Sequence, residues 1–332
     1  MSLPTGGTTG VVLIGCGGVG RKRAAALPES CRLLAVFDPE PERAASLAAL
    51  VAPGALVAPT AAEALAVGGA SLAITATPHA ALVPASVAAV EAGCHALVEK
   101  PGADRLGPLL ELRAAAEAAG RMVRVGFNHR FHPSVRMAAS LIAEGDYGPL
   151  MHVRGRYGHG GRPGYDSEWR ADRAISGGGE LLDQGVHLID LVRHLFGDVD
   201  LAFAECRTDF WKMDVEDNAF LALRPRSGGF AWLHATWTEW RNLFSFEIAL
   251  TRAKIEIAGL GGSYGTERLT LYEMLPEMGP PATRAWEWPQ ADRSWERELD
   301  DMLAAIEGRP SIGATLGDAA EALRIVEEAY AW

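Results

Sequence analysis

The chain has 332 residues, of which 48% are hydrophobic and 22% charged, and its formal net charge is −11. This composition is typical of a globular protein, and at about 100–200 residues per domain the length predicts two domains. The acidic balance, with no basic run, argues against nucleic-acid binding, and no apolar stretch approaches the roughly 20 residues of a transmembrane helix. The four cysteines, at positions 16, 31, 94 and 206, have no Cys-x-x-Cys spacing, and residues 1–10 have no secretory signal. We therefore expect a cytoplasmic protein with reduced thiols.

Short apolar strands alternate with alanine-rich helices in the first part of the chain. The pattern predicts strands at 11–15, 33–38, 72–76, 95–99 and 122–126, and helices at 21–27, 40–50, 83–92 and 106–119. Continuous apolar strands are typical of a buried parallel sheet. Right-handed crossovers through the helices then form a doubly wound, Rossmann-type domain, which we predict over residues 1–128.

The pattern changes over residues 129–332. Helices are predicted at 133–144, 179–196, 294–307 and 316–330, and strands at 151–157, 201–211, 218–224, 229–240, 243–250, 253–258 and 268–274. This order predicts an α+β domain with a large, mostly antiparallel open sheet, which we assign to substrate binding and oligomerisation. One face of the 229–240 strand carries Trp232, His234, Thr236, Thr238 and Trp240. A second copy of the chain is the simplest cover for such a face, so we expect a homodimer or homotetramer.

A glycine-rich turn between the first strand and the first helix fits the pattern G-x-G-x-x-G. It comprises Gly15, Cys16, Gly17, Gly18, Val19 and Gly20. The first glycine permits a tight turn, the second lets a pyrophosphate approach the backbone, and the third allows close helix–strand packing. Asp38 ends the second strand, where a carboxylate accepts hydrogen bonds from the adenosine ribose and repels a 2′-phosphate. These features predict a site for NAD and disfavour NADP.

Two further motifs carry groups suited to acid–base chemistry. Lys100 follows the 95–99 strand at the carboxyl edge of the sheet, where ligands bind in doubly wound folds, and Pro101 favours an extended backbone there. Residues 177–179 are glycines that lead into a helix with Asp183 and His187 one turn apart. Imidazole can take the proton of an alcohol, a carboxylate can orient the imidazole, and an ammonium group stabilises the developing alkoxide. A solvated lysine and a packed, hydrogen-bonded histidine are the structural alternatives.

In this order the motifs resemble those of the glucose–fructose oxidoreductase/inositol dehydrogenase (Gfo/Idh/MocA) family. The resemblance includes the glycine turn, Asp38, Glu99-Lys100-Pro101, residues 126–131 and the glycine-led Asp183/His187 motif, and it covers nearly the whole chain. It implies a Rossmann domain, a carboxy-terminal sheet that forms dimers, and a catalytic trio of Lys100, Asp183 and His187. It also implies cofactor contacts from Thr75, Ala76, Thr77, Pro78, His79, Glu99, Lys100, Pro101, Asn128, Trp169 and Arg170.

The leading hypothesis is an NAD-dependent dehydrogenase that oxidises a secondary alcohol of a sugar, cyclitol or sugar derivative. His187 and Lys100 must then act on the same carbon–oxygen bond, and the sequence leaves open which of them is the base. The substrate contacts that we expect are Lys100, Tyr157, Tyr165, Asp183 and His187, with His159, Arg162 and His234 as further candidates. Two alternatives are a glycoside hydrolase that oxidises its substrate transiently with NAD and a non-catalytic NAD-binding regulator. No spacing of His, Cys or carboxylates predicts a metal site, and the identity of the sugar or cyclitol stays open.

Overall fold

The computed structural model describes residues 8–332, so residues 1–7 of the segment considered for a secretory signal lie outside it. The chain divides into two compact units, 8–128 with 295–320, and 129–294 with 321–332. Residues 295–320 therefore belong to the first unit, whereas the sequence pattern assigned them to the second. The reason is that Leu299, Met302 and Leu303 of helix α9 (Ser294–Ile306) pack into the first unit's core. No helix between residues 8 and 332 is long and apolar enough to cross a bilayer.

The first unit is built on a seven-stranded sheet in the order β15-β6-β5-β4-β1-β2-β3. Its strands are β1 (Thr9–Ile14), β2 (Cys31–Phe37), β3 (Leu56–Val57), β4 (Ala70–Thr75), β5 (His95–Glu99), β6 (Val123–Gly126) and β15 (Ala314–Thr315). All neighbouring strands are parallel except β15, which runs antiparallel to β6. The strand order reverses at β1, and the carboxyl ends beside such a point are where ligands bind. The predicted Rossmann-type parallel sheet is confirmed.

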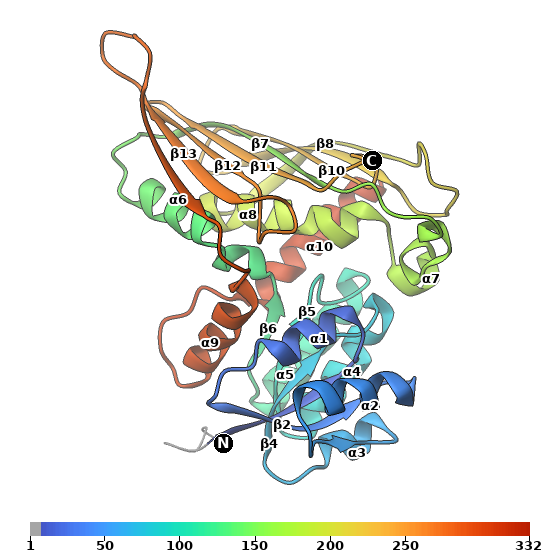
Figure 1. The fold of residues 1–332 in the computed structure, drawn as a ribbon. Coiled ribbons are helices and arrows are strands. Elements are labelled where there is room, and N and C mark those ends of the chain that lie inside the picture. The colour runs from blue at the N-terminus through green and yellow to red at the C-terminus, as the bar shows by residue number, and fades with distance from the viewer. Residues whose placement is uncertain (1–7) are drawn as a thin grey trace. The chain divides into compact units, whose positions relative to one another are not determined.

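Helices cover both faces of this sheet (Figure 1). They are α1 (Gly18–Ala25), α2 (Pro41–Val51), α3 (Ala61–Leu65), α4 (His79–Glu91), α5 (Leu106–Ala119), α9 and the start of α10 (Leu316–Tyr330). Successive residues of β1 point to opposite faces, so Val11 and Leu13 pack with α1, α2 and α9, while Val12 and Ile14 pack with α3 and α4. Burial on both faces explains why the strands are continuously apolar rather than alternating.

The second unit contains an eight-stranded sheet in the order β14-β13-β12-β11-β7-β10-β9-β8. Its strands are β7 (Leu150–Gly158), β8 (Val199–Arg207), β9 (Asn218–Pro225), β10 (Phe230–Thr236), β11 (Leu243–Leu250), β12 (Ala253–Ala258), β13 (Glu267–Glu273) and β14 (Ala282–Trp288). Only β7 and β10 pair in parallel among these described strands, which confirms the mostly antiparallel sheet. The sequence pattern did not predict β14, because this strand has no buried face to produce alternation.

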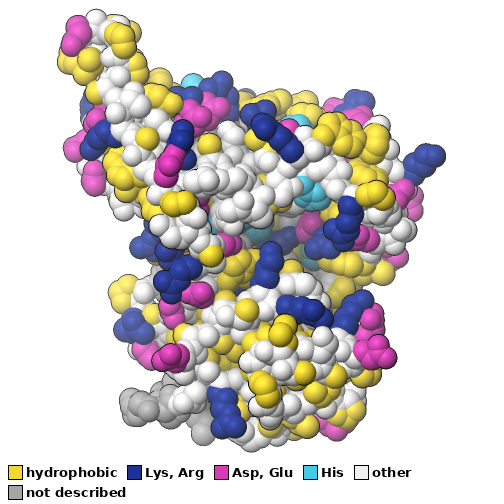
Figure 2. All heavy atoms as spheres, in the orientation of Figure 1, with side chains coloured by type: hydrophobic (Ala, Val, Ile, Leu, Met, Phe, Trp, Pro, Cys, Tyr) yellow, Lys and Arg dark blue, Asp and Glu magenta, His cyan; other side chains and the backbone are white. Residues whose placement is uncertain are grey.

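Helices α6 (Pro133–Ala143), α7 (Arg173–Ser176) and α8 (Val186–Phe196) belong to this unit, and α6 and α8 pack on one face of the sheet (Figure 1). The described chain places no helix on the other face. The hairpin that joins β13 to β14 projects beyond the sheet, and its tip exposes hydrophobic side chains, among them Met278 (Figure 2). This unit therefore has two exposed apolar features, the open face and the hairpin tip.

The predicted aromatic face of the 229–240 strand is only partly correct. Strand β10 ends at Thr236, whose hydroxyl accepts a hydrogen bond from the Thr238 N–H and turns the chain out of the sheet. Thr236 is buried, and Trp240, with φ of +58°, lies beyond the strand. Trp232 stays on the open face, where its ring stacks on Phe203 with centroids 5.9 Å apart.

Candidate active site

The glycine turn connects β1 to α1 and has the geometry of an anion-binding turn. Gly15 has φ of +95°, a conformation that favours glycine, and a Cβ there would overlap the backbone of Ala76. A Cβ on Gly20 would overlap the Gly15 carbonyl, so the helix approaches the strand closely. Apart from the adjoining residues of the turn and helix, no atom of the described chain lies within 4 Å of a Cβ placed on Gly17 or Gly18. The first N–H groups of α1 suit a phosphate.

Asp38 directly follows β2, and its carboxylate lies against the glycine turn. Its Oδ2 accepts the Cys16 N–H at 2.7 Å and its Oδ1 accepts the Glu40 N–H at 2.9 Å. A carboxylate has about four acceptor positions, so further ones suit ribose hydroxyls. The negative charge here favours NAD over a cofactor with a 2′-phosphate. Burial raises the pKa of the Cys16 thiol to about 12, so this thiol is a packed, neutral group.

The segment after β4 divides into exposed backbone and buried side chains. Thr75 is buried, with its hydroxyl 2.9 Å from that of Ser86, and His79 is buried in the first turn of α4. Ala76, Thr77 and Pro78 lie between them at the carboxyl edge of the sheet, and the Ala76 N–H donates to the Ile14 carbonyl. Of the five predicted cofactor contacts, these three are the ones that are not buried.

Glu99 and Lys100 end β5 in different environments. Glu99 is buried, and its carboxylate accepts a hydrogen bond from Arg23 Nε at 2.5 Å. Arg23 Nη1 also lies 2.6 Å from Glu298, so this buried arginine connects α1, β5 and α9. Burial opposes the Arg23 charge, but the two carboxylates outweigh it and raise its pKa. Glu99 is thus held by an ion pair with Arg23. Lys100, the next residue, is half-buried and precedes Pro101 through a cis peptide bond.

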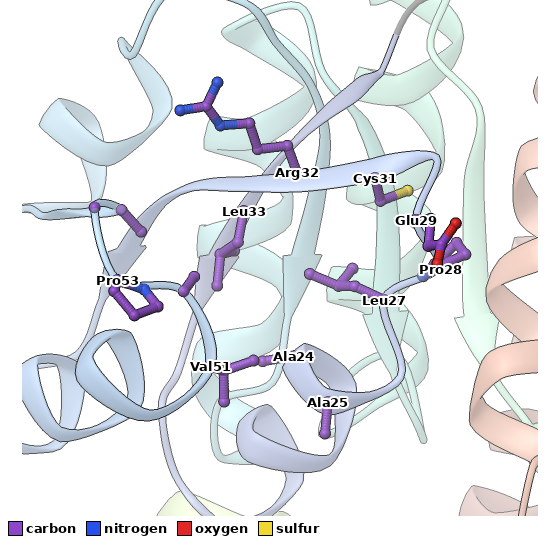
Figure 3. A pocket seen from close by; sticks show the side chains of 13 residues that line it. Ala24, Ala25, Leu27, Pro28, Glu29, Cys31, Arg32, Leu33, Val51 and Pro53 are labelled. Atoms are coloured by element: carbon purple, nitrogen blue, oxygen red, sulfur yellow. The ribbon is translucent and has the colours of Figure 1, made fainter.

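A hollow of about 460 Å³ in the first unit lies away from these residues (Figure 3). It is lined by the end of α1, the beginning of β2 and the residues after α2, at the amino edge of the sheet. None of the predicted cofactor residues lines it, because Asp38 and the glycine turn lie at the carboxyl edge. Asn128, which is buried just after β6, also lies at the carboxyl edge.

In the second unit, Asp183 lies in a π-helical turn, Leu181–Gly185, that continues into α8. A π turn holds more residues than an α turn, so the predicted four-residue spacing does not alone determine how Asp183 and His187 face each other. The Asp183 carboxylate accepts a hydrogen bond from Arg170 Nε at 2.9 Å. Arg170 in turn stacks on Trp169, 4.4 Å from its ring centroid. Of the pair predicted to contact the cofactor, Arg170 therefore binds Asp183 and Trp169 packs on Arg170.

His187 is buried in an aromatic cluster that the sequence analysis did not assign. Its ring stacks on His129, with centroids 3.7 Å apart and planes 18° apart. Tyr157 lies against both rings, at 6.1 Å from His187 and 5.1 Å from His129. Tyr264 packs on Tyr157 at 5.0 Å. Burial raises the pKa of Tyr157 well above 10, which keeps its phenol protonated. His129 belongs to the 126–131 motif, which was the one sequence signal for it.

Tyr165 and His159 lie in a second aromatic group beside Asp183. Tyr165 packs against Trp237 at 5.1 Å and His159 at 5.5 Å. Burial, and then the negative charges of Asp183 and Glu180, raise the pKa of Tyr165. Burial also lowers the pKa of His159, so this ring is neutral near pH 7. Flat rings next to a charged pair suit a ligand with both apolar and hydroxyl surfaces.

Two candidate substrate residues have other environments. His234 stacks on Phe220 at 4.1 Å and its Nε2 lies 3.0 Å from Asn218 Oδ1. Residues alternate across β10, so His234 lies on the sheet face opposite the one that Leu233 and Ala235 share with the His187 segment. Arg162 is exposed and pairs with Glu168 at 2.6 Å. His234 is thus excluded from the His187 cluster. No group of three His, Cys, Asp or Glu side chains in residues 8–332 could hold a metal ion.

Known proteins match both units. Residues 9–127 match the family model for the oxidoreductase family with an NAD-binding Rossmann fold, and residues 135–256 match that for the GFO/IDH/MocA C-terminal domain. Levoglucosan dehydrogenase of Pseudarthrobacter phenanthrenivorans is 31% identical over 156 residues, covering 46% of this chain and 40% of that protein. Inositol 2-dehydrogenase of Streptomyces avermitilis is 31% identical over 193 residues, covering 57% and 53%. The chain thus spans about half the length, or less, of these relatives.

Among solved structures, GenD2 from gentamicin A biosynthesis, in complex with NAD, has a TM-score of 0.84 and 25% identity and covers 100% of this chain and 95% of that one. The two family models follow each other along the chain as the two units do. With the glycine turn and Asp38 in the geometry that a dinucleotide needs, the chain belongs to the Gfo/Idh/MocA oxidoreductase family, and its first unit is an NAD-binding Rossmann domain.

Proposed function

We propose that this protein is an NAD-dependent dehydrogenase that oxidises a secondary alcohol of a sugar, a cyclitol or a sugar derivative. The observation that carries the proposal is the environment of the second unit's acid–base groups. Asp183 is ion-paired with Arg170, and His187 is buried and stacked on His129. Asp183 and His187 thus lie in a chain whose other unit is an NAD-binding domain. Relatives named for levoglucosan and inositol, both ring compounds with several hydroxyl groups, support a ring alcohol as substrate.

In the proposed reaction His187 takes the hydroxyl proton of the substrate. The stack with His129 restricts rotation of the imidazole, so its nitrogen keeps one direction. The Asp183 carboxylate, which accepts a hydrogen bond from Arg170, stabilises the imidazolium that results. Lys100 supplies a positive charge to the substrate oxygen while alkoxide character develops. Bound NAD⁺ supplies the hydride acceptor, with Asp38 and the glycine turn as its binding residues.

The test is a screen of NADH formation with aldoses, polyols, cyclitols, amino sugars and nucleotide sugars, followed by variants on the best substrate. Because general acid–base catalysis contributes about 10²–10⁴-fold, His187→Ala should lower kcat by at least about 100-fold. His194→Ala, in the same helix, is the control. The effects of substituting residues that act in the same step are not additive. Lys100→Met should therefore lower kcat far less in the His187→Ala variant than in the wild-type protein.

Undiminished turnover of the His187→Ala variant would contradict the assignment. Stoichiometry separates the dehydrogenase from the hydrolase alternative. A dehydrogenase forms one NADH for each substrate oxidised, whereas a hydrolase that oxidises its substrate transiently releases cleaved glycoside without net NADH.

We also propose that the open face of the eight-stranded sheet binds a second copy of the chain. Trp232 is 42% exposed there although it stacks on Phe203, and Phe230 is exposed on the same strand. Large exposed apolar groups on an uncovered sheet are typical of subunit interfaces.

A further inference from the structure

Three consecutive backbone N–H groups at the beginning of the Asp183 turn are all bound by one distant residue, Glu216. The Gly179 N–H lies 3.0 Å from Oε1 and 3.1 Å from Oε2 of its carboxylate, and the Leu181 N–H donates to Oε1 at 3.1 Å. The N–H of Glu180, between them, donates to the Glu216 main-chain carbonyl at 3.0 Å. Tyr330, the last residue of α10, donates its hydroxyl to Oε1 at 2.8 Å. We call this set the Glu216 clamp.

The first N–H groups of a helix have no partner within the helix, and a side chain just before it usually binds them. Here residues 177–179 are glycines without a side chain, and the side chain of Glu180, directly before the turn, makes no capping hydrogen bond. Glu216 performs this role from a position 37 residues further along the chain than Gly179. Its carboxylate also places negative charge at the positive end of the helix dipole.

The clamp also explains two of the three glycines. A Cβ on Gly179 would overlap the backbone of Glu216, and a Cβ on Gly178 would overlap the hydroxyl of Tyr330. Any side chain at either position would push the turn away from Glu216 and Tyr330. The glycines are therefore required by the close approach of these two residues.

The clamped backbone is coupled directly to Asp183. The Asp183 N–H donates to the carbonyl of Gly179 at 2.9 Å, so a displacement of Gly179 is passed on to Asp183. His187 follows in the same continuous helix. A misplacement of about 1 Å can cost 100-fold in rate, because acid–base groups act over hydrogen-bond distances.

Burial raises the pKa of both clamp side chains, Tyr330 and Glu216. Burial raises the pKa of Tyr330 well above 10, so its hydroxyl stays a donor. Burial also raises the pKa of Glu216, although the bonds from Tyr330 and the backbone oppose this effect.

We propose that Glu216, held by Tyr330, is a positioning residue that fixes the π turn and thereby the directions of Asp183 and His187. The proposal depends on the proposed function only in that it treats Asp183 and His187 as the acid–base groups. It adds two residues, Glu216 from the loop before β9 and Tyr330 from the end of α10, which affect the reaction only by holding the turn in place.

The main test compares Tyr330→Phe, which deletes one hydroxyl, with Tyr147→Phe as a matched control. Tyr147 also donates its hydroxyl to a glutamate, Glu273 at 2.9 Å, in the same unit but outside the clamp. Three quantities are measured on the full chain: hydrogen exchange of the peptide covering residues 177–187, kcat on the best substrate, and KM for NAD. Because a hydrogen bond to a charged group is lost, Tyr330→Phe should accelerate exchange there and lower kcat by about tenfold, with KM for NAD unchanged.

Tyr147→Phe should change none of these three quantities. A second series, Glu216→Gln and Glu216→Ala, adds a graded comparison. Gln keeps one carbonyl acceptor for the turn, so its kcat should lie between those of the wild type and Glu216→Ala. If the Glu216 variants do not fold, Tyr330→Phe decides the question.

Two outcomes would overturn the proposal: unchanged exchange at 177–187 in Tyr330→Phe, or accelerated exchange with an unchanged kcat. A wild-type protein that oxidises none of the screened alcohols would instead contradict the proposed function. The exchange comparison would then still decide whether Glu216 and Tyr330 hold the turn.

Discussion

At the scale of single residues, buried carboxylates secure helix beginnings that lack a local cap. Glu216 does so for the π turn, and Glu267 does so for α6. The Glu267 carboxylate accepts the Ser134 N–H at 2.8 Å and lies 2.9 Å from His132 Nδ1. His132 precedes α6 without capping it through its own side chain. A residue from the sheet therefore determines where this helix begins.

The Glu267 contacts predict a pH-dependent contribution to stability. Burial opposes ionisation of Glu267, but the bonds from His132 and Ser134 outweigh it and lower its pKa below the ordinary 4.5. A group whose pKa is lowered on folding stabilises the protein above its unfolded pKa and loses that contribution as the pH falls through its folded pKa. Glu267→Gln should therefore reduce the free energy of unfolding by about 1.5–3 kcal/mol at pH 7.

The measurement is urea unfolding of both proteins between pH 7 and acid pH. The difference in unfolding free energy should shrink as the pH falls below the ordinary glutamate pKa of 4.5. A difference that grows on acidification would contradict the assigned shift. Asp292→Asn is the control, because it removes the other carboxylate near His132, which lies 3.9 Å from His132 Nε2.

At the scale of elements, the turn between β1 and α1 combines glycines of two kinds. Gly15 and Gly20 are required by the fold, since a Cβ at either would overlap backbone. Gly17 is not, because no described residue other than its chain neighbours comes within 4 Å of a Cβ there, and its φ of −68° suits any residue. Close approach of a pyrophosphate is the physical reason for a glycine at that position.

Gly17→Ala should therefore weaken NAD binding without loss of stability. We expect the Kd for NAD to rise by at least about tenfold, because the methyl group occupies the path of the pyrophosphate. Titration calorimetry gives the Kd, and the melting temperature of the ligand-free protein should be unchanged. Gly68→Ala, at an equally open glycine that precedes β4 and lies outside the turn, should keep the wild-type Kd. Equal loss of affinity in both variants would contradict this interpretation of the turn.

At the scale of the whole molecule, the second unit leaves one sheet face uncovered within the described chain (Figure 1). Trp232 of β10 and Phe203 of the edge strand β8 form a stacked aromatic pair on that face. Large aromatic residues contribute most to the affinity of subunit interfaces. If the face binds a second copy, this aromatic pair should determine the assembly state.

Trp232→Ser should weaken self-association by about 30-fold or more, which corresponds to the 2 kcal/mol of an interface hot spot. Sedimentation velocity over a range of concentrations measures the change. Leu50→Ser, a change at another exposed apolar residue in the first unit, should leave association unchanged. A wild-type protein that sediments as a monomer at all concentrations would contradict the proposed interface.

The sequence alone determined the five parallel strands β1, β2, β4, β5 and β6 of the first unit and its cofactor, because these depend on local patterns. Apolar strands, helix ends such as Gly120 and the glycine turn with Asp38 are specified by residues close together in the chain. Most strands of the second unit were predictable for the same reason, from alternation along each strand.

Only the tertiary structure decided how the acid–base residues are held. The contacts of Arg170 with Asp183, of His129 with His187, and of Glu216 with Tyr330 and residues 179–181 join residues up to 114 positions apart. Strand β15 likewise joins a parallel sheet from the far end of the chain. Such contacts leave no periodicity in the sequence, since each depends on where the fold brings two distant side chains. The π turn itself follows from that packing, which is why the local pattern predicted an ordinary α-helix there.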